Sequence, residues 1–164
     1  GFIYLGKMGW YLSGKDVLSI ILDVFLLTLF GTLLSSCVNV WLSTSGQASA
    51  VGTIISAGYG FICGAYMPIS NFSEGLQKAL SFLPGTYGTS LIRNHCLRGV
   101  YEEMGSQGFP ADVVDLIKDS IDCNLYFFDN KVETETMYII MVCAILVLLA
   151  VYILINVLRS DKRR

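Results

Sequence analysis

An uncharged apolar segment near the carboxyl end constrains this chain more than any other feature. Residues 137–158 contain no charged side chain. As a helix, this segment rises about 33 Å at 1.5 Å per residue, which is enough to cross the roughly 30 Å hydrocarbon core of a bilayer. A second apolar segment, residues 17–42, carries a single charge, Asp23. Both segments predict membrane-spanning helices.

The composition of the whole chain agrees with a membrane protein. Apolar residues make up 54% and charged residues 15% of the 164 positions, against about 45–50% and about 25% in soluble domains. The formal net charge is −2, and no basic run is interleaved with aromatic residues. We therefore expect membrane lipids as partners and no nucleic acid. The first twelve residues lack the features of a signal peptide, so we expect the chain to be part of a longer protein.

A ridge of small side chains distinguishes residues 50–67, which are predicted to form a third span. Every fourth position is small: Gly52, Ser56, Gly60 and Gly64. Glycine costs a soluble helix about 1 kcal/mol relative to alanine, whereas in lipid a small-residue ridge lets a second helix approach closely. We predict a helix-packing ridge; the alternative is a loosely packed helix that happens to contain glycine.

Two prolines divide the segment that follows. Pro68 is expected to end the third span, because proline disfavours helical geometry in the residue before it. Residues 71–83 are amphipathic and too short to span, so they predict an interfacial or re-entrant helix. Pro84 and the glycine after it indicate a turn, followed by a more polar helix over residues 86–104.

Residues 105–135 have the composition of a small water-exposed insertion. Pro110 stands where a helix could begin. Its polar face is expected to carry the acidic residues Asp112, Asp115, Asp119 and Asp122. No calcium-binding spacing occurs among them, so we interpret this face as solvated.

Candidate catalytic and metal-binding residues are scarce. His95 is the only histidine and stands beside Cys96, but no acidic residue is placed by local spacing to orient it. We therefore interpret His95 as a polar residue on a surface helix and predict no catalytic group, metal site or cofactor. Cys96 and Cys123 could form a disulfide if this region is extracytoplasmic, and the sequence leaves that open.

Asp23 lies inside a predicted span, where a carboxylate is costly and therefore a candidate functional group. At about 100° per residue it points away from a polar stripe on the same helix, made of Thr28, Thr32, Ser35 and Asn39. A continuous polar path along this helix is not predicted. We favour a hydrogen-bonded or snorkelled structural group over a substrate or proton site.

A basic tail orients the predicted spans. Arg159, Lys162, Arg163 and Arg164 follow the last apolar segment, and such an excess marks the cytoplasmic side. The fold class is thus an all-α, multi-pass protein of the cell membrane with a cytoplasmic carboxyl terminus. Its predicted parts are an external loop (1–16), a span (17–42), a cytoplasmic turn (43–49), a span (50–67), a re-entrant or interfacial helical pair (68–104), an extracytoplasmic helical insertion (105–135), a span (136–158) and a cytoplasmic tail (159–164).

Two motifs resemble the permease subunit of ABC type-2 transporters. They are GAYMPISNF at residues 64–72 and LSFLPGTYGTSLIRNHCLRGV at residues 80–100, and an apolar helix with a basic tail closes the chain. The resemblance implies that the three spans are the fourth to sixth of a six-helix permease. It also implies a second permease subunit as partner, and an outer gate shaped by Tyr66, Pro68, Pro84, Tyr87 and Arg93.

The resemblance implies an exporter that moves a drug, lipid or polysaccharide-like substrate outward. The chain contains no GxxxxGK[ST] motif, so a separate ATP-binding cassette subunit would supply the energy and this chain would not be an enzyme. Two other function classes stay open: a membrane enzyme acting on lipid-linked substrates, and a membrane anchor that transports nothing.

Overall fold

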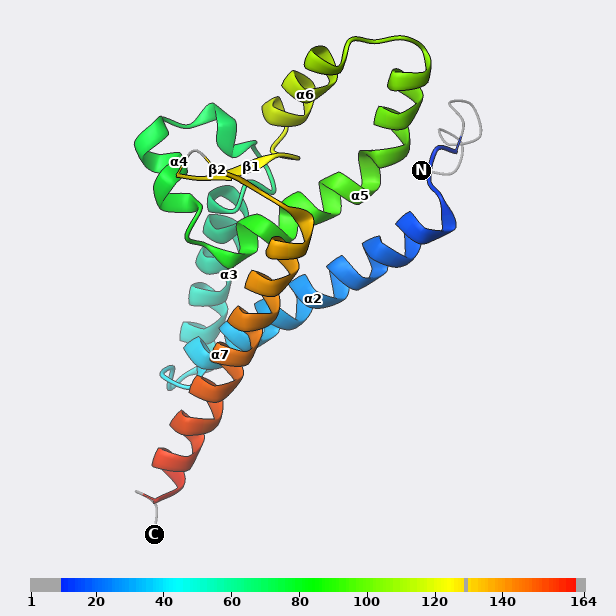
Figure 1. Ribbon diagram of the computed structural model, residues 1–164. Helices are drawn as coiled ribbons and strands as arrows, with labels where there is room; N and C mark the ends of the chain where they lie inside the picture. The colour runs from blue at the N-terminus through cyan, green and yellow to red at the C-terminus, as the bar shows by residue number, and fades with distance from the viewer. Residues whose placement is uncertain (1–9, 129, 162–164) are drawn as a thin grey trace.

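A computed structural model describes residues 10–128 and 130–161. This part of the chain is mostly helical (Figure 1). Most of the predicted external loop (1–16) and three residues of the basic tail lie outside the described residues. The elements are α2 (Gly14–Asn39), α3 (Ser45–Ile62), the 3-10 helix η1 (Ile69–Asn71), α4 (Glu74–Leu80), α5 (Pro84–Ser106), α6 (Ala111–Ser120), β1 (Leu125–Phe127), β2 (Asn130–Val132) and α7 (Thr134–Asp161).

The two most apolar segments form long helices, as predicted. Of the helices in the described residues, α2 and α7 are the two that are long and apolar enough to cross a membrane. Their ends lie within three residues of the predicted span boundaries. The loop between α2 and α3 lies at one end of the molecule with the carboxyl end of α7, and α4, α6 and the hairpin lie at the other (Figure 1).

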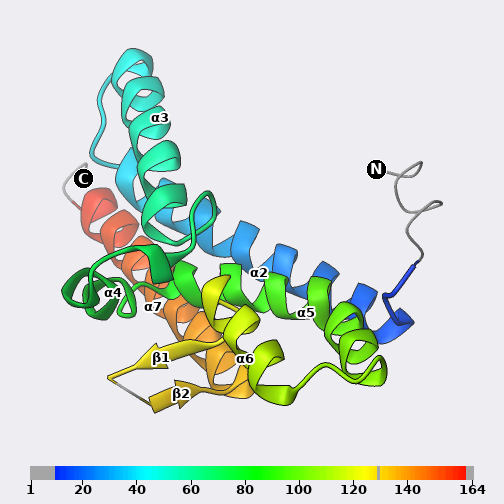
Figure 2. The ribbon, with the colours of Figure 1, turned by 90° about the horizontal axis from the view of Figure 1, so that it is seen from above.

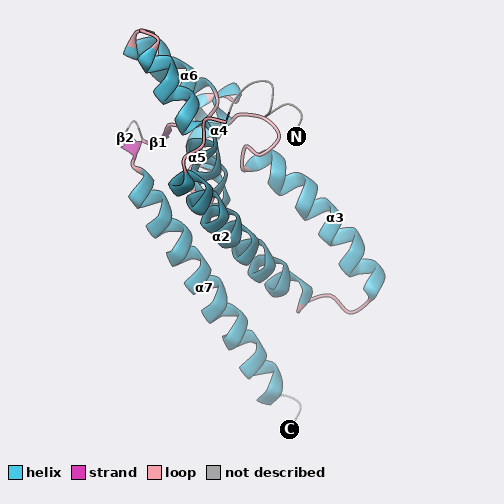
Figure 3. Cartoon of the chain, turned by 90° about the vertical axis from the view of Figure 1, so that its right-hand side faces the viewer, coloured by secondary structure: helices cyan, strands magenta, loops and turns pink. Residues whose placement is uncertain are grey.

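The core lies where α5 packs against both candidate spans. Pro84 occupies the first turn of α5, where its missing N–H has no helical partner to lose. From there α5 lies beside α2 and α7, and α3 stands apart (Figures 2 and 3). The buried apolar side chains that join these helices are Phe30, Tyr87, Leu91, Met137, Met141 and Ile145.

Two glycines let α5 approach its neighbours closely. A Cβ added at Gly88 would lie 2.8 Å from a methyl group of Leu27, and one added at Gly99 would lie 1.7 Å from the backbone oxygen of Tyr11. The later glycine of α5 meets the earlier residue near α2, so α5 runs antiparallel to the first half of α2. Close packing of glycine against neighbouring segments therefore occurs on α5.

The predicted end of the third helix is wrong. The prediction placed it at Pro68, but α3 ends at Ile62. Gly64 adopts a left-handed φ of 77°; its N–H donates to the carbonyl of Phe61 and that of Ala65 to the carbonyl of Gly60, at 3.2 Å and 2.9 Å. These two bonds form a Schellman motif, which terminates a helix. Gly64 thus ends the helix and is not a member of its ridge.

The all-α prediction is also wrong in one detail. Leu125–Phe127 and Asn130–Val132 pair as an antiparallel hairpin within the predicted helical insertion. Its strands are only three residues long, and the aromatic run in the first strand favours extended structure. The hairpin leads directly into α7.

Replacing Gly99 should destabilise the protein more than replacing another glycine of the same helix. In Gly99→Ala the new methyl group meets backbone, which cannot move aside as a side chain can, so we expect a loss of about 1–3 kcal/mol. Gly105→Ala is the matched control, because nothing lies within 4 Å of a Cβ there; it should be neutral or stabilise by up to about 1 kcal/mol. Thermal denaturation in detergent measures both, and equal melting temperatures would contradict the packing.

Candidate functional site

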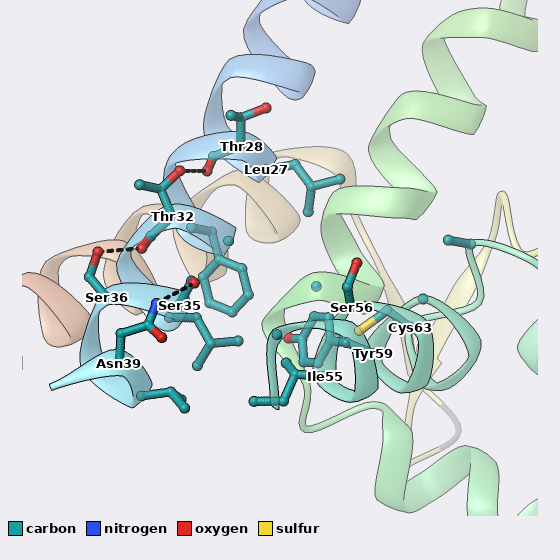
Figure 4. A pocket seen from close by; sticks show the side chains of 18 of the residues that line it. Leu27, Thr28, Thr32, Ser35, Ser36, Asn39, Ile55, Ser56, Tyr59 and Cys63 are labelled. Atoms are coloured by element: carbon teal, nitrogen blue, oxygen red, sulfur yellow. Dashed lines mark hydrogen bonds between the residues drawn. The ribbon is translucent and has the colours of Figure 1, made fainter. Parts of the chain in front are cut away.

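A groove between α2 and α3 has a volume of about 610 Å³. Its α2 wall carries the predicted polar stripe: Thr28, Thr32, Ser35 and Asn39, together with Ser36. The α3 wall carries Gly52, Ser56 and Gly60 of the predicted ridge (Figure 4). Two features that the sequence suggested separately therefore face each other across one groove.

The polar side chains of the α2 wall are bonded within their own helix. The Thr32 hydroxyl donates to the carbonyl of Thr28 at 2.8 Å, and the Ser36 hydroxyl donates to that of Thr32 at 2.7 Å (Figure 4). Such bonds satisfy hydroxyl donors that have no water, while the oxygen keeps acceptor capacity. The groove can therefore stay open in a membrane without unpaired donors from these two groups.

The α3 wall combines small residues with one aromatic ring. A Cβ at Gly52 would have nothing within 4 Å, whereas Gly60 is covered by the ring of Tyr66. The ring of Tyr59 faces Phe30 across the groove, with 6.1 Å between centroids. None of the described residues that line the groove is Asp, Glu, Lys, Arg or His. The groove thus offers apolar surface with uncharged polar groups.

Asp23 does not line this groove and points instead to α5 and α7. Its side chain is fully buried, one oxygen lies 2.6 Å from Nδ1 of His95, and the other accepts a hydrogen bond from the hydroxyl of Tyr138. His95 donates to this carboxyl group in the tautomer that carries its hydrogen on Nδ1. Three helices therefore meet at one buried carboxylate.

The prediction that His95 is a polar residue on a surface helix is wrong, since His95 is 9% exposed. Its acidic partner is 72 positions away in the sequence, so local spacing could not reveal it. A usable signal was present: a carboxylate inside a predicted span requires a partner, and His95 is the only histidine in the chain.

His95 also borders a second, polar cavity of about 520 Å³ between α5 and α6. The cations there already face carboxylates within the chain. Nε of Arg98 lies 3.2 Å from Glu102, and Nζ of Lys118 lies 3.6 Å from Asp115. These exposed pairs contribute little stability.

Arg93, one of the predicted gate residues, belongs to a second buried cluster centred on Asp122. Arg93 donates to the carbonyl of Gly64 and pairs with Asp122 at 3.3 Å. The carboxylate of Asp122 also accepts from the backbone N–H groups of Ile69 and Ser70. The cluster ties α5 to the segment that follows α3 and to the end of α6.

The interpretation of Asp122 as part of a solvated acidic face is therefore wrong, since Asp122 is 4% exposed. Its left-handed φ of 56° turns the chain at the end of α6, a conformation that aspartate tolerates better than most residues. Asp112 and Asp115 are exposed, as the solvated interpretation requires.

The other predicted gate residues lie around the same connection between α3 and α5. Tyr87 is buried, and its hydroxyl donates to the carbonyl of Ser81 at 2.6 Å. Tyr66 is exposed and rests edge-on against Phe61. Pro68 precedes η1 and Pro84 begins α5. None of the five predicted gate residues lines the groove itself.

Cys96 and Cys123 are both free thiols in the structure. Cys96 is exposed, whereas Cys123 is buried and lies 3.4 Å from the hydroxyl of Tyr101. Burial raises the pKa of the Cys123 thiol above its ordinary value, which disfavours the reactive thiolate.

Comparison with known proteins does not identify a family for this chain. No family model, no curated protein and no solved structure matches the chain. Within the described residues, no group of three or more His, Cys, Asp or Glu side chains could hold a metal ion. The groove between α2 and α3 is therefore the candidate site on geometry alone.

Removing the buried carboxylate should destabilise the protein strongly. Asp23→Ala leaves the His95 and Tyr138 donors without an acceptor, and truncating one partner of a buried pair costs about 3–5 kcal/mol. Asp115→Ala is the control, because its pair with Lys118 is largely exposed and exposed pairs contribute at most about 1 kcal/mol. Thermal denaturation in detergent measures both variants. A similar melting temperature for the two would contradict the role of Asp23 in joining the helices.

Proposed function

We propose that this chain is a membrane-embedded part of an ABC type-2 exporter permease and that the groove between α2 and α3 forms one wall of the substrate path. The observation that carries the proposal is the meeting of the uncharged polar stripe of α2 with the small-residue ridge of α3. The choice of the ABC type-2 family rests on the sequence motifs at residues 64–72 and 80–100, which resemble that family.

The chemistry of the groove suits an amphiphilic substrate. Threonine, serine and asparagine side chains along one wall offer weak polar contacts, and Leu27, Ile55 and Phe30 supply apolar surface. Because the lining carries no formal charge, entry of a substrate does not require desolvation of an ion, which is the largest cost of a buried polar site. The binding of drugs, lipids or lipid-linked saccharides is favoured over that of small ions.

The exposure of α3 supports a second subunit. No residue of α3 is buried, and Ile54, Phe61 and Ile62 are exposed. We propose that α3 is the third span and that a second permease subunit covers it, with the groove enclosed between the two subunits. The α4–α5 segment is proposed as the re-entrant pair and the five gate residues as its outer closure. The carboxyl terminus is proposed to be cytoplasmic, near a separate ATP-binding subunit.

Blocking the groove should uncouple substrate from ATP hydrolysis. Gly52→Leu places a side chain in the groove, and steric exclusion of a single methylene group already costs about 1–3 kcal/mol. In the full-length protein, reconstituted with its ATP-binding subunit, we expect the substrate-stimulated part of ATP hydrolysis to fall roughly tenfold or more. Amphiphilic compounds supplied one at a time serve as candidate substrates.

Gly58→Leu is the matched control on the same helix. Both glycines have nothing within 4 Å of an added Cβ, so both variants should insert and fold, but Gly58 does not line the groove. Equal stimulation in the two variants would place the substrate path elsewhere. A protein that neither binds the ATP-binding subunit nor alters its turnover would overturn the transporter proposal in favour of a membrane anchor.

Thiol labelling tests the proposed orientation. Gln107→Cys lies after α5 and Gly46→Cys lies in the first turn of α3, and both positions are exposed. An impermeant maleimide should label Gln107→Cys in intact cells and Gly46→Cys only after permeabilisation, because the basic tail places its own end of the bundle in the cytoplasm. The unsubstituted protein gives the background. The reverse pattern would invert the topology.

A further inference from the structure

Three phenylalanine rings form an exposed cluster where the hairpin meets the turn between α4 and α5. Phe82 lies in that turn, Phe127 ends β1, and Phe128 begins the hairpin turn. Their ring centroids are 5.0–5.9 Å apart and the rings meet edge to face. The residues are 62%, 37% and 51% exposed. The rings contact one another, and about half of their combined surface contacts nothing in the chain.

The conformation of Phe128 is unusual for a large side chain. Its φ of 46° lies in the left-handed region, which hairpin turns normally fill with glycine or asparagine. A bulky residue there costs of order 1–3 kcal/mol, and such strain is typical of functional positions. The Phe128 ring contacts Phe82 and Phe127, but 51% of its surface stays exposed, and a contact outside the chain accounts best for that exposed part.

The cluster lies at the level where α7 would enter a membrane. β2 ends at Val132 and α7 begins at Thr134, so the hairpin is held within two residues of a candidate span. At 1.5 Å per residue the 26-residue candidate span Thr134–Arg159 rises about 39 Å. That length exceeds the roughly 30 Å hydrocarbon core. The first turn of α7, and the hairpin with it, therefore lies at headgroup depth.

The surroundings of the cluster favour lipid as its partner. In the view from above, the hairpin extends to the side of α7 and away from α2 (Figure 2). The helix α7 also exposes the apolar side chains of Ile139, Val142 and Leu146, which lipid would cover. Across the strand pair, exposed Lys131 stands opposite Tyr126. Aromatic rings beside a snorkelling lysine are typical of the membrane interface.

We infer that Phe82, Phe127 and Phe128 form an interfacial anchor that inserts into the bilayer at headgroup depth. Because Phe82 belongs to the α4–α5 turn and the other two rings to the hairpin, the anchor fixes the depth of both segments together. The inference requires that α2 and α7 span a membrane, but it does not depend on transport. A second copy of the chain is the competing occupant.

Tryptophan fluorescence in brominated phosphatidylcholine vesicles tests the anchor. In a full-length background with Trp10→Phe and Trp41→Phe, we compare Phe128→Trp with Phe109→Trp, a similarly exposed ring in the α5–α6 loop. Lipids brominated near the headgroup should quench roughly half of the Phe128→Trp emission, because an interfacial ring contacts the upper acyl chains. The emission of Phe109→Trp should be unchanged. Phe82→Trp is a second probe, for use if Phe128→Trp does not fold, and we expect the same quenching of its emission.

Leu146→Trp separates the anchor from membrane insertion itself. Leu146 is exposed in the middle of α7, so its tryptophan should be quenched by lipids brominated deep in the acyl chain. Quenching of Leu146→Trp without quenching of Phe128→Trp and Phe82→Trp would overturn the anchor and leave the spans in place. Protection of these two probes in proportion to dimer formation would assign the cluster to a second copy. Absence of quenching at Leu146→Trp would overturn the membrane placement and the anchor with it.

Discussion

The packing of this molecule depends on one buried carboxylate, that of Asp23. It accepts hydrogen bonds from His95 of α5 and Tyr138 of α7, and so joins the three helices that build the core. An unpaired carboxylate in this position would be strongly unfavourable, so the interaction selects one register of α5 along α2. Gly88 and Gly99 then make that register possible, because an added Cβ would meet the Leu27 side chain of α2 at Gly88 and the Tyr11 backbone just before α2 at Gly99.

The position of α5 determines both the closure of the groove and the position of the segment that follows α3. Its first turn closes the groove with Gly85 and Thr89, and Arg93 holds the segment after α3 through Asp122. By contrast, α3 is held mainly at its end and has no buried residue. The molecule thus combines a rigid unit of α2, α5 and α7 with one weakly supported helix.

Local chemistry explains which elements could be predicted. Apolar length identified α2 and α7, and Pro110 marked the start of α6, because these signals depend on nearest neighbours along the chain. The turn predicted at Pro84 is instead the first turn of α5. The end of α3 was mispredicted because Gly64, through its left-handed backbone, terminates the helix four residues before Pro68. The aromatic strand at Leu125–Phe127 was missed because three residues give too short a pattern to recognise.

The sequence by itself determined the apolar helices, the polar stripe of α2 and the small residues of α3, because each follows from residue type at helical spacing. Only the tertiary structure decided that stripe and ridge face one groove, that His95 reaches Asp23, and that Asp122 is buried beneath Arg93. The pair of Arg93 and Asp122 is separated by 29 positions and that of Asp23 and His95 by 72, and local spacing carries no information about such contacts. They form because a buried charge must find a partner wherever the packing of helices brings one within reach.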